Sequence, residues 1–327
     1  EVAQSHEGSL GNAMAFVDAA KASGADAVKF QTHIAAEEST PQEPWRIPFS
    51  KQDASRYDYW KRMEFSFEQW AALKAHCDMR SIIFLSSAFS LKACDWLAKL
   101  GMPAWKVASG EIGNDQLLER MMSTGQPILI STGLAGPEQA IATTRRVQAN
   151  GNPVALLHCT TRYPTPPEAV GLNILADFRE ALPDTPIGLS DHSGTPNPAI
   201  IASYLGASII EVHLALHKTM FGPDVSSSLT PETLRQLVEG TEAAWRMRQH
   251  PVDKEQQLGE LGRESSIFGR SLYTTMAVPS GTRITEEMIA YKKPGGGLSY
   301  TQRDLLLDRT ALRDLPVHHM LSADDVA

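Results

Sequence analysis

The stretch from 154 to 160 reads Val154-Ala155-Leu156-Leu157-His158-Cys159-Thr160, an apolar run that ends in polar residues. A run of this length without polar alternation is typical of a parallel strand that is buried on both faces. Similar runs recur along the chain, and helix-like segments such as 12–23 and 67–80 separate them. The other predicted strands are 27–31, 82–87, 104–109, 128–132, 187–192 and 209–214, with 1–3 as the remnant of an eighth strand whose beginning we expect to be missing.

Eight strands that alternate with helices predict an α/β fold, a (β/α)8 TIM barrel, and a small domain follows it. An open doubly wound sheet shares much of this pattern but usually carries a glycine-rich phosphate turn after an early strand, and no such turn is present. We predict a barrel over 1–247, a polar linker over 248–265 and the small domain over 266–327.

Composition restricts the class of protein. The hydrophobic content of 42% and the charged content of 21% are ordinary for a globular chain, which argues against disorder. No apolar run is long enough to span a membrane, so we predict a cytoplasmic protein without a membrane partner. The net charge of -8 disfavours a nucleic-acid partner, which leaves a small-molecule substrate as the expectation.

Polar residues gather where the predicted strands end, and that edge carries the active site of a β/α barrel. Alternate residues of a strand share a face, so His192 at the end of one strand and His213 at the end of the next can converge. Two neutral imidazoles can bind one divalent metal, and the acidic residues Glu211 and Asp224 nearby favour this interpretation. The alternative is that each histidine is a hydrogen-bonded residue of the barrel interior.

Two lysines, Lys29 and Lys106, lie inside predicted buried strands, where an unpaired ammonium is costly. We expect a bound phosphate or carboxylate to pair with both. The hydroxyl groups that would complete the anion site belong to Ser87, Ser109, Ser131 and Ser190. Two alternatives remain open: internal salt bridges to Glu1 and Glu111, and a lysine that forms a Schiff base.

These residues lie in motifs that resemble the bacterial N-acetylneuraminate (sialic acid) synthases and their legionaminate and pseudaminate relatives over nearly the whole chain. The motifs are Ser5-His6-Glu7-Gly8-Ser9, Ala27-Val28-Lys29-Phe30-Gln31-Thr32, Trp105-Lys106-Val107-Ala108-Ser109-Gly110-Glu111, Ser131-Thr132-Gly133, Leu157-His158-Cys159-Thr160, Tyr163-Pro164-Thr165-Pro166, Gly188-Leu189-Ser190-Asp191-His192 and Gly222-Pro223-Asp224.

The resemblance implies a barrel followed by an antifreeze-like (SAF) domain, a domain-swapped homodimer, and condensation of phosphoenolpyruvate with an N-acylated hexosamine. It implies that Mn²⁺ or Mg²⁺ binds His192 and His213. Catalytic roles are implied for Glu1, Lys29, Lys106 and Glu211. Substrate contacts are implied for Gln31, Ser87, Ser109, Glu111, Ser131, Thr161, Tyr163, Ser190, Asp224 and Lys293.

Four positions depart from the family pattern. Thr161 replaces a frequent Asn and Ser87 a frequent Thr, and both changes keep a hydrogen-bonding side chain. Val212 replaces a basic residue and Lys293 an arginine, and these two changes bear on which sugar is used. The alternatives are therefore a synthase for a related sugar acid, namely legionaminate, pseudaminate or an unacylated analogue, and a non-catalytic carbohydrate-binding homologue.

Overall fold

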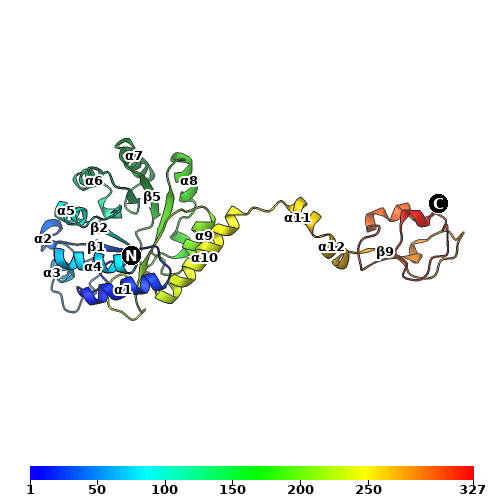
Figure 1. The fold of residues 1–327 in the computed structure, drawn as a ribbon, viewed down its shortest axis with the longest axis horizontal. Helices are drawn as coiled ribbons and strands as arrows, with labels where there is room; N and C mark the ends of the chain where they lie inside the picture. Colours follow the sequence, from blue (N-terminus) through cyan, green and yellow to red (C-terminus); the bar gives the residue numbers. More distant parts are fainter. The chain divides into compact units, whose positions relative to one another are not determined.

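The computed structural model describes residues 1–327, which divide into two compact units, Glu1–His250 and Pro251–Ala327. The first unit is built on a curled, eight-stranded parallel sheet whose neighbours follow chain order (Figure 1). Its strands are β1 (Ala27–Thr32), β2 (Ile83–Ala88), β3 (Trp105–Val107), β4 (Ile128–Ser131), β5 (Val154–Cys159), β6 (Ile187–Asp191), β7 (Ile210–Leu214) and β8 (Ser228–Leu229). The predicted TIM-barrel-like architecture is confirmed.

The N-terminal segment spans the gap between β1 and β7. The Val2 amide donates to the Lys29 carbonyl at 2.8 Å, and the Leu214 amide donates to the Glu1 carbonyl at 2.8 Å. The segment forms only an isolated bridge, between Ala3 and Phe30, rather than the predicted strand. The short strand β8, which pairs with the end of β7, was not predicted. This arrangement places Glu1 between strands that carry Lys29 and Glu211.

Helices surround the strands of the first unit (Figure 1). They are α1 (Leu10–Ala22), α2 (Ala35–Glu38), α3 (Arg56–Met63), α4 (Phe67–Met79), α5 (Leu91–Lys99), α6 (Asp115–Met122), α7 (Pro137–Ala149), α8 (Ile174–Ala181), α9 (Asn197–Tyr204) and α10 (Pro231–Gln249), with short 3₁₀ turns η1 (Ser109–Glu111), η2 (Pro167–Ala169) and η3 (Val225–Ser227). The start of α4 shows why the helices begin where they do. The Ser66 hydroxyl accepts from the backbone N–H of Gln69, and the side-chain oxygen of Gln69 accepts from the backbone N–H of Ser66. This reciprocal pair is a capping box.

The core of the first unit lies between strands and helices. Trp70 of α4 contacts Phe30 of β1 and Phe84 of β2, with ring centroids 6.2 and 6.4 Å apart. Phe16 of α1 is also fully buried. Each such side chain contributes about 1.5–3 kcal/mol by leaving water, so this layer fixes the strands whose ends carry the polar residues.

The second unit contains the helices α11 (Lys254–Glu260) and α12 (Gly262–Phe268), the antiparallel pair β9 (Ser271–Thr274) and β10 (Ile289–Lys292), and the 3₁₀ turns η4 (Glu286–Met288), η5 (Tyr300–Leu305) and η6 (Ala323–Asp325). Its small core includes Leu272, Ile284, Leu306 and Leu321. The segment 248–265, read from sequence as a linker, holds the end of α10, all of α11 and the start of α12.

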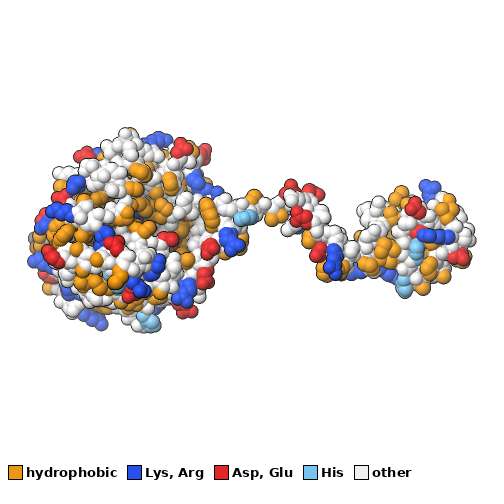
Figure 2. Space-filling view, viewed as in Figure 1, with side chains coloured by type: hydrophobic (Ala, Val, Ile, Leu, Met, Phe, Trp, Pro, Cys, Tyr) orange, Lys and Arg blue, Asp and Glu red, His pale blue; other side chains and the backbone are white.

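Basic and acidic side chains are interspersed on the visible surface of the first unit (Figure 2), in keeping with the modest net charge of -8. None of the helices combines the length and the apolar character needed to cross a membrane.

Candidate active site

A cavity of about 410 Å³ lies at the carboxyl ends of the strands. Every site residue predicted in the first unit lines it: Glu1, Lys29, Gln31, Ser87, Lys106, Ser109, Glu111, Ser131, Thr161, Tyr163, Ser190, His192, Glu211, His213 and Asp224. The remaining predicted residue, Lys293, follows β10 in the second unit, where it is exposed and its ammonium lies 5.7 Å from the centre of the Phe268 ring. The cavity volume suits small organic substrates.

The cavity floor carries two buried lysines that share one carboxylate. The Nζ atoms of Lys29 and Lys106 lie 3.6 and 3.8 Å from Glu211 Oε1. Lys29 also forms an ion pair with Glu1, as one sequence alternative proposed, but the Glu111 carboxylate accepts from Asn114 instead of a lysine. The two lysines thus face two carboxylates, Glu1 and Glu211, of which only Glu211 is near both. The ammonium hydrogens that these pairs leave unused can donate to a bound anion.

The charges on the floor shift the pKa values of these groups. Burial alone raises the pKa of Glu211, but Lys106 and Lys29 outweigh it and hold the pKa at about 2. Burial lowers the pKa of Lys29 to about 8, with Glu211 opposing and Lys106 adding to the effect. At neutral pH Lys29 and Glu211 are therefore both charged.

Serine hydroxyls surround the lysines. Lys106 Nζ donates to Ser131 Oγ at 2.6 Å, and the Gly133 amide donates to Ser109 Oγ at 3.2 Å. Ser190 Oγ donates to Glu211 at 3.3 Å, whereas the buried Ser87 Oγ has no hydrogen-bond partner. A buried hydroxyl without a partner is costly, so Ser87 is available to a ligand of the cavity.

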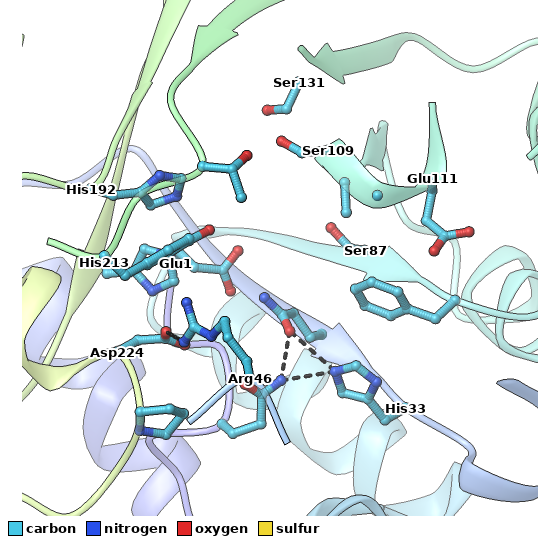
Figure 3. A pocket seen from close by; sticks show the side chains of 18 of the residues that line it. Glu1, His33, Arg46, Ser87, Ser109, Glu111, Ser131, His192, His213 and Asp224 are labelled. Atoms are coloured by element: carbon cyan, nitrogen blue, oxygen red, sulfur yellow. Dashed lines mark hydrogen bonds and ion pairs between the residues drawn. The ribbon is translucent and has the colours of Figure 1, made fainter. Parts of the chain in front are cut away.

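Two histidines face the cavity opposite the serines (Figure 3). The rings of His192 and His213 have centroids 5.3 Å apart, and the Tyr163 ring lies 4.1 Å from that of His192. His192 Nδ1 lies 2.9 Å from the Thr160 carbonyl, which only accepts, so Nδ1 carries a hydrogen and, in the neutral ring, Nε2 keeps a lone pair. Burial lowers the pKa of the His192 ring, but Cys159 and the Thr160 carbonyl outweigh it and raise the pKa above its ordinary value. Burial and the neighbouring His192 lower the pKa of His213 well below its ordinary value, so its ring is neutral.

The donor chemistry of these rings fits a divalent metal. Neutral imidazole nitrogens are good ligands for such ions, and the Thr160 carbonyl orients His192 in the way that groups behind metal ligands commonly do. No cluster of three or more His, Cys, Asp or Glu side chains with metal-binding geometry occurs in residues 1–327. An ion held by the two histidines would therefore complete its coordination with water or substrate oxygens.

The outer wall of the cavity contains residues that sequence reasoning missed. The Arg46 guanidinium lies 4.3 Å from the centre of the Tyr163 ring, and its Nη2 donates to Asp224 Oδ1 at 2.6 Å (Figure 3). Arg46 belongs to an irregular segment between α2 and α3, where no periodicity points toward a site. His33, in contrast, lies two residues beyond Gln31 and four beyond Lys29, so the strand alternation could have identified it.

Comparisons with known proteins identify the family and the fold. The family model described as the NeuB family matches residues 16–253. N-acetylneuraminate-9-phosphate synthase of Homo sapiens is 31% identical over 89% of this chain and 81% of its own length. N,N'-diacetyllegionaminic acid synthase of Campylobacter jejuni is 29% identical over 96% of this chain and 95% of its own. The crystal structure of N-acetylneuraminic acid synthetase from Leptospira borgpetersenii superposes with a TM-score of 0.70 at 26% identity, covering 81% of this chain and 90% of that one.

Proposed function

The chain belongs to the NeuB family of sugar-acid synthases, and we propose that it condenses phosphoenolpyruvate with an N-acylated hexosamine, such as N-acetylmannosamine, to give a sialic-acid-type nonulosonic acid and phosphate. One observation carries the proposal: a single cavity holds a floor of two buried lysines and several serines opposite two facing imidazoles. The floor suits an anion, and the imidazole side suits the carbonyl end of a sugar.

Phosphoenolpyruvate is the proposed ligand of the floor. Its phosphate and carboxylate would pair with Lys29 and Lys106, which now share Glu211. Ser131 already accepts from Lys106 and can donate its own hydrogen to the ligand, and Ser87 has an uncommitted hydroxyl. Ser109 and Ser190 complete the set of donors.

The reaction needs a carbon–carbon bond, a water and a leaving group. Carbon 3 of phosphoenolpyruvate attacks the aldehyde carbon of the open-chain sugar, whose oxygen takes a proton. Positive charge then develops at carbon 2, water adds there, and phosphate leaves with cleavage of its carbon–oxygen bond. The carboxylates of Glu1 and Glu211, both beside Lys29, are placed to accept the proton of that water.

His192 and His213 are the proposed ligands of a divalent metal, Mn²⁺ or Mg²⁺. When bound, the ion would act as a Lewis acid that polarises the sugar aldehyde. Equilibrium dialysis with Mn²⁺ should show binding to the unmodified chain and a large loss in His192→Ala and His213→Ala. Normal Mn²⁺ binding by both variants would refute the assignment, whatever their activity.

The sugar is assigned to the outer part of the cavity, where Gln31, Glu111, Thr161, Tyr163 and Asp224 present hydrogen-bonding groups. An assay of phosphate release with phosphoenolpyruvate and a panel of acylated and unacylated hexosamines tests the function, and product masses identify the sugar acid. We expect release with N-acylated hexosamines. Absence of release with every sugar, in the presence of Mn²⁺ or Mg²⁺, would favour a non-catalytic carbohydrate-binding protein instead.

The second unit is proposed to be an antifreeze-like (SAF) domain that contributes Lys293 to the site of a partner subunit in a domain-swapped homodimer. Lysine offers one compact ammonium where arginine offers a planar fork, so recognition of the acyl group should be looser. Mixed dimers of Lys293→Ala and His192→Ala subunits test this arrangement, because one of their two sites would carry neither defect. Recovery of activity in demonstrated mixed dimers is expected, and its absence would exclude the trans arrangement.

A further inference from the structure

We infer that Gln4 and His33 are positioning residues that hold the Gln31 amide in one orientation, with its NH₂ group turned to the cavity, so that Gln31 recognises only a hydrogen-bond acceptor on the sugar. The inference rests on the proposed function and narrows its substrate class. Gln4 and His33 are nearly inaccessible to solvent and line the cavity behind Gln31.

Four side chains form a continuous hydrogen-bonded series, of which Figure 3 shows the bonds on one side of the His33 ring. Gln4 Nε2 lies 2.5 Å from Gln31 Oε1 and 2.8 Å from His33 Nε2. His33 Nδ1 lies 2.5 Å from Glu38 Oε1 at the other side of the ring. The series therefore runs from Glu38 through His33 and Gln4 to the amide of Gln31.

The His33 ring cannot turn freely, because it is stacked between two aromatic rings. The Trp60 ring lies 4.2 Å from it at an interplanar angle of 22°, and the Phe89 ring lies 4.4 Å from it at 14°. The stacking keeps the two ring nitrogens aimed at Glu38 and at Gln4. Aromatic packing thus fixes the middle of the series in place.

The direction of the hydrogen bonds follows from donor and acceptor chemistry. A carboxylate only accepts, so His33 Nδ1 carries a hydrogen and, in the neutral ring, Nε2 accepts from the Gln4 amide. The second hydrogen of the Gln4 NH₂ group then goes to Gln31 Oε1. This arrangement commits the oxygen of Gln31 to the Gln4 amide.

Only the NH₂ group of Gln31 is then left for a ligand, and it makes no hydrogen bond within the protein. An NH₂ group can donate to an acyl carbonyl or to a sugar hydroxyl oxygen, but it opposes an ammonium, which has no acceptor. The fixed orientation thus selects a sugar with an acceptor at this point and disfavours an unacylated amino sugar. Leaving a buried polar group unpaired is the physical basis of such rejection.

The decisive variant reverses the polarity of the series. Glu at position 4 can only accept, so in Gln4→Glu the Gln31 amide should turn its NH₂ group toward position 4 and its oxygen toward the cavity. We expect the KM for the acylated sugar to rise about 10-fold, the scale of one hydrogen bond, with the KM for phosphoenolpyruvate unchanged. Gln139→Glu, the same change on the exposed face of α7, is the matched control and should leave both values unchanged.

A double-mutant cycle separates positioning from general structural damage. In a Gln31→Leu background, Gln4→Glu should cause no further rise in sugar KM, because the group it reorients is gone. Additive effects, or an equal rise in the KM for phosphoenolpyruvate, would overturn the inference. Gln4→Leu, which adds no charge, provides the same comparison if Gln4→Glu does not fold. Turnover by the unmodified enzyme is measured first, so that failure of the proposed function is recognised separately. If there is no turnover, the affinity for the sugar is measured by calorimetry in the presence of phosphate and replaces KM in the same comparisons.

Discussion

The most informative perturbation is Glu211→Gln, because Glu211 is the carboxylate that Lys29 and Lys106 share. The change keeps the size of the side chain and removes its charge. It leaves Lys106 with no carboxylate nearby and Lys29 with Glu1 alone. All three side chains are largely withdrawn from water, with exposed fractions of 16% for Glu211, 7% for Lys29 and 3% for Lys106.

The distances set the size of the effect. At an effective dielectric constant of about 20, unit charges 3.6 and 3.8 Å apart attract by about 4–5 kcal/mol per pair. Part of this attraction offsets the cost of burying the charges, and removing one partner of a buried pair costs about 3–5 kcal/mol in practice. We therefore expect the free energy of unfolding of the first unit to fall by about 3 kcal/mol at pH 7.

Urea unfolding, followed by tryptophan fluorescence, measures this loss. Glu111→Gln is the matched control: it also lines the cavity, but its partner is Asn114, and it should cost less than about 1 kcal/mol. Inorganic phosphate should restore more stability to Glu211→Gln than to the unmodified chain, because it pairs with lysines that no longer share a carboxylate. Equal stability of the two variants, or equal stabilisation by phosphate, would refute this account of the floor.

Three further changes test other parts of the molecule. Gly133→Ala should abolish turnover while the fold survives, because the added Cβ would lie 2.2 Å from Thr161 Oγ1, and retained kcat/KM would contradict this. Burial lowers the pKa of Lys29 to about 8, so kcat/KM for phosphoenolpyruvate should decline above pH 8 in the unmodified enzyme. In Lys29→Arg this decline should vanish, because arginine stays charged. If the variant shows the same decline, Lys29 is not its source. Asp325→Asn should destabilise the second unit by about 2 kcal/mol at pH 7. Burial raises the pKa of Asp325, but Ser322, Arg313 and His319 outweigh it and hold the pKa at about 2. The charged carboxylate therefore stabilises the unit fully above its ordinary pKa of 3.8, and this stabilisation is lost as the pH falls toward 2. Urea titrations of the full chain should show the difference in unfolding free energy between Asp325→Asn and the unmodified chain shrinking as the pH falls, and a difference that stays constant would contradict this.

The fold was predictable because its strands are short apolar runs bounded by polar residues. The run 154–160 became Val154–Cys159, a strand in which every residue is buried. The run 104–109 shrank to Trp105–Val107 because the chain turns into a 3₁₀ helix at Ser109. Ser228–Leu229 escaped prediction because two residues carry no periodicity. The helices α11 and α12 were missed because their polar residues show no apolar stripe, and none of them is buried.

The floor of the site was predictable for a different reason. Strand alternation and the cost of burying an ammonium together single out Lys29, Lys106 and Glu211 from local sequence alone. Arg46 and Asp224 are 178 positions apart, and no pattern in either segment anticipates their hydrogen bond. The sequence also suggested Glu111 as an ion-pair partner of the lysines, but Glu111 accepts from Asn114. The partner that both lysines share is Glu211, which pairs with Ser190 of the neighbouring strand.

The proposed function assigns substrate choice to the outer wall. Relatives named for N-acetylneuraminate-9-phosphate and for N,N'-diacetyllegionaminic acid stand at 31% and 29% identity to this chain, so similarity alone favours neither sugar. A floor that binds phosphoenolpyruvate contributes equally to every such reaction and cannot discriminate between sugars. Discrimination requires groups that are left unpaired by the wrong sugar. The amide of Gln31, whose oxygen accepts from Gln4, and the guanidinium of Arg46, which donates to Asp224, are candidates for such groups. We expect them to decide which hexosamine the cavity accepts.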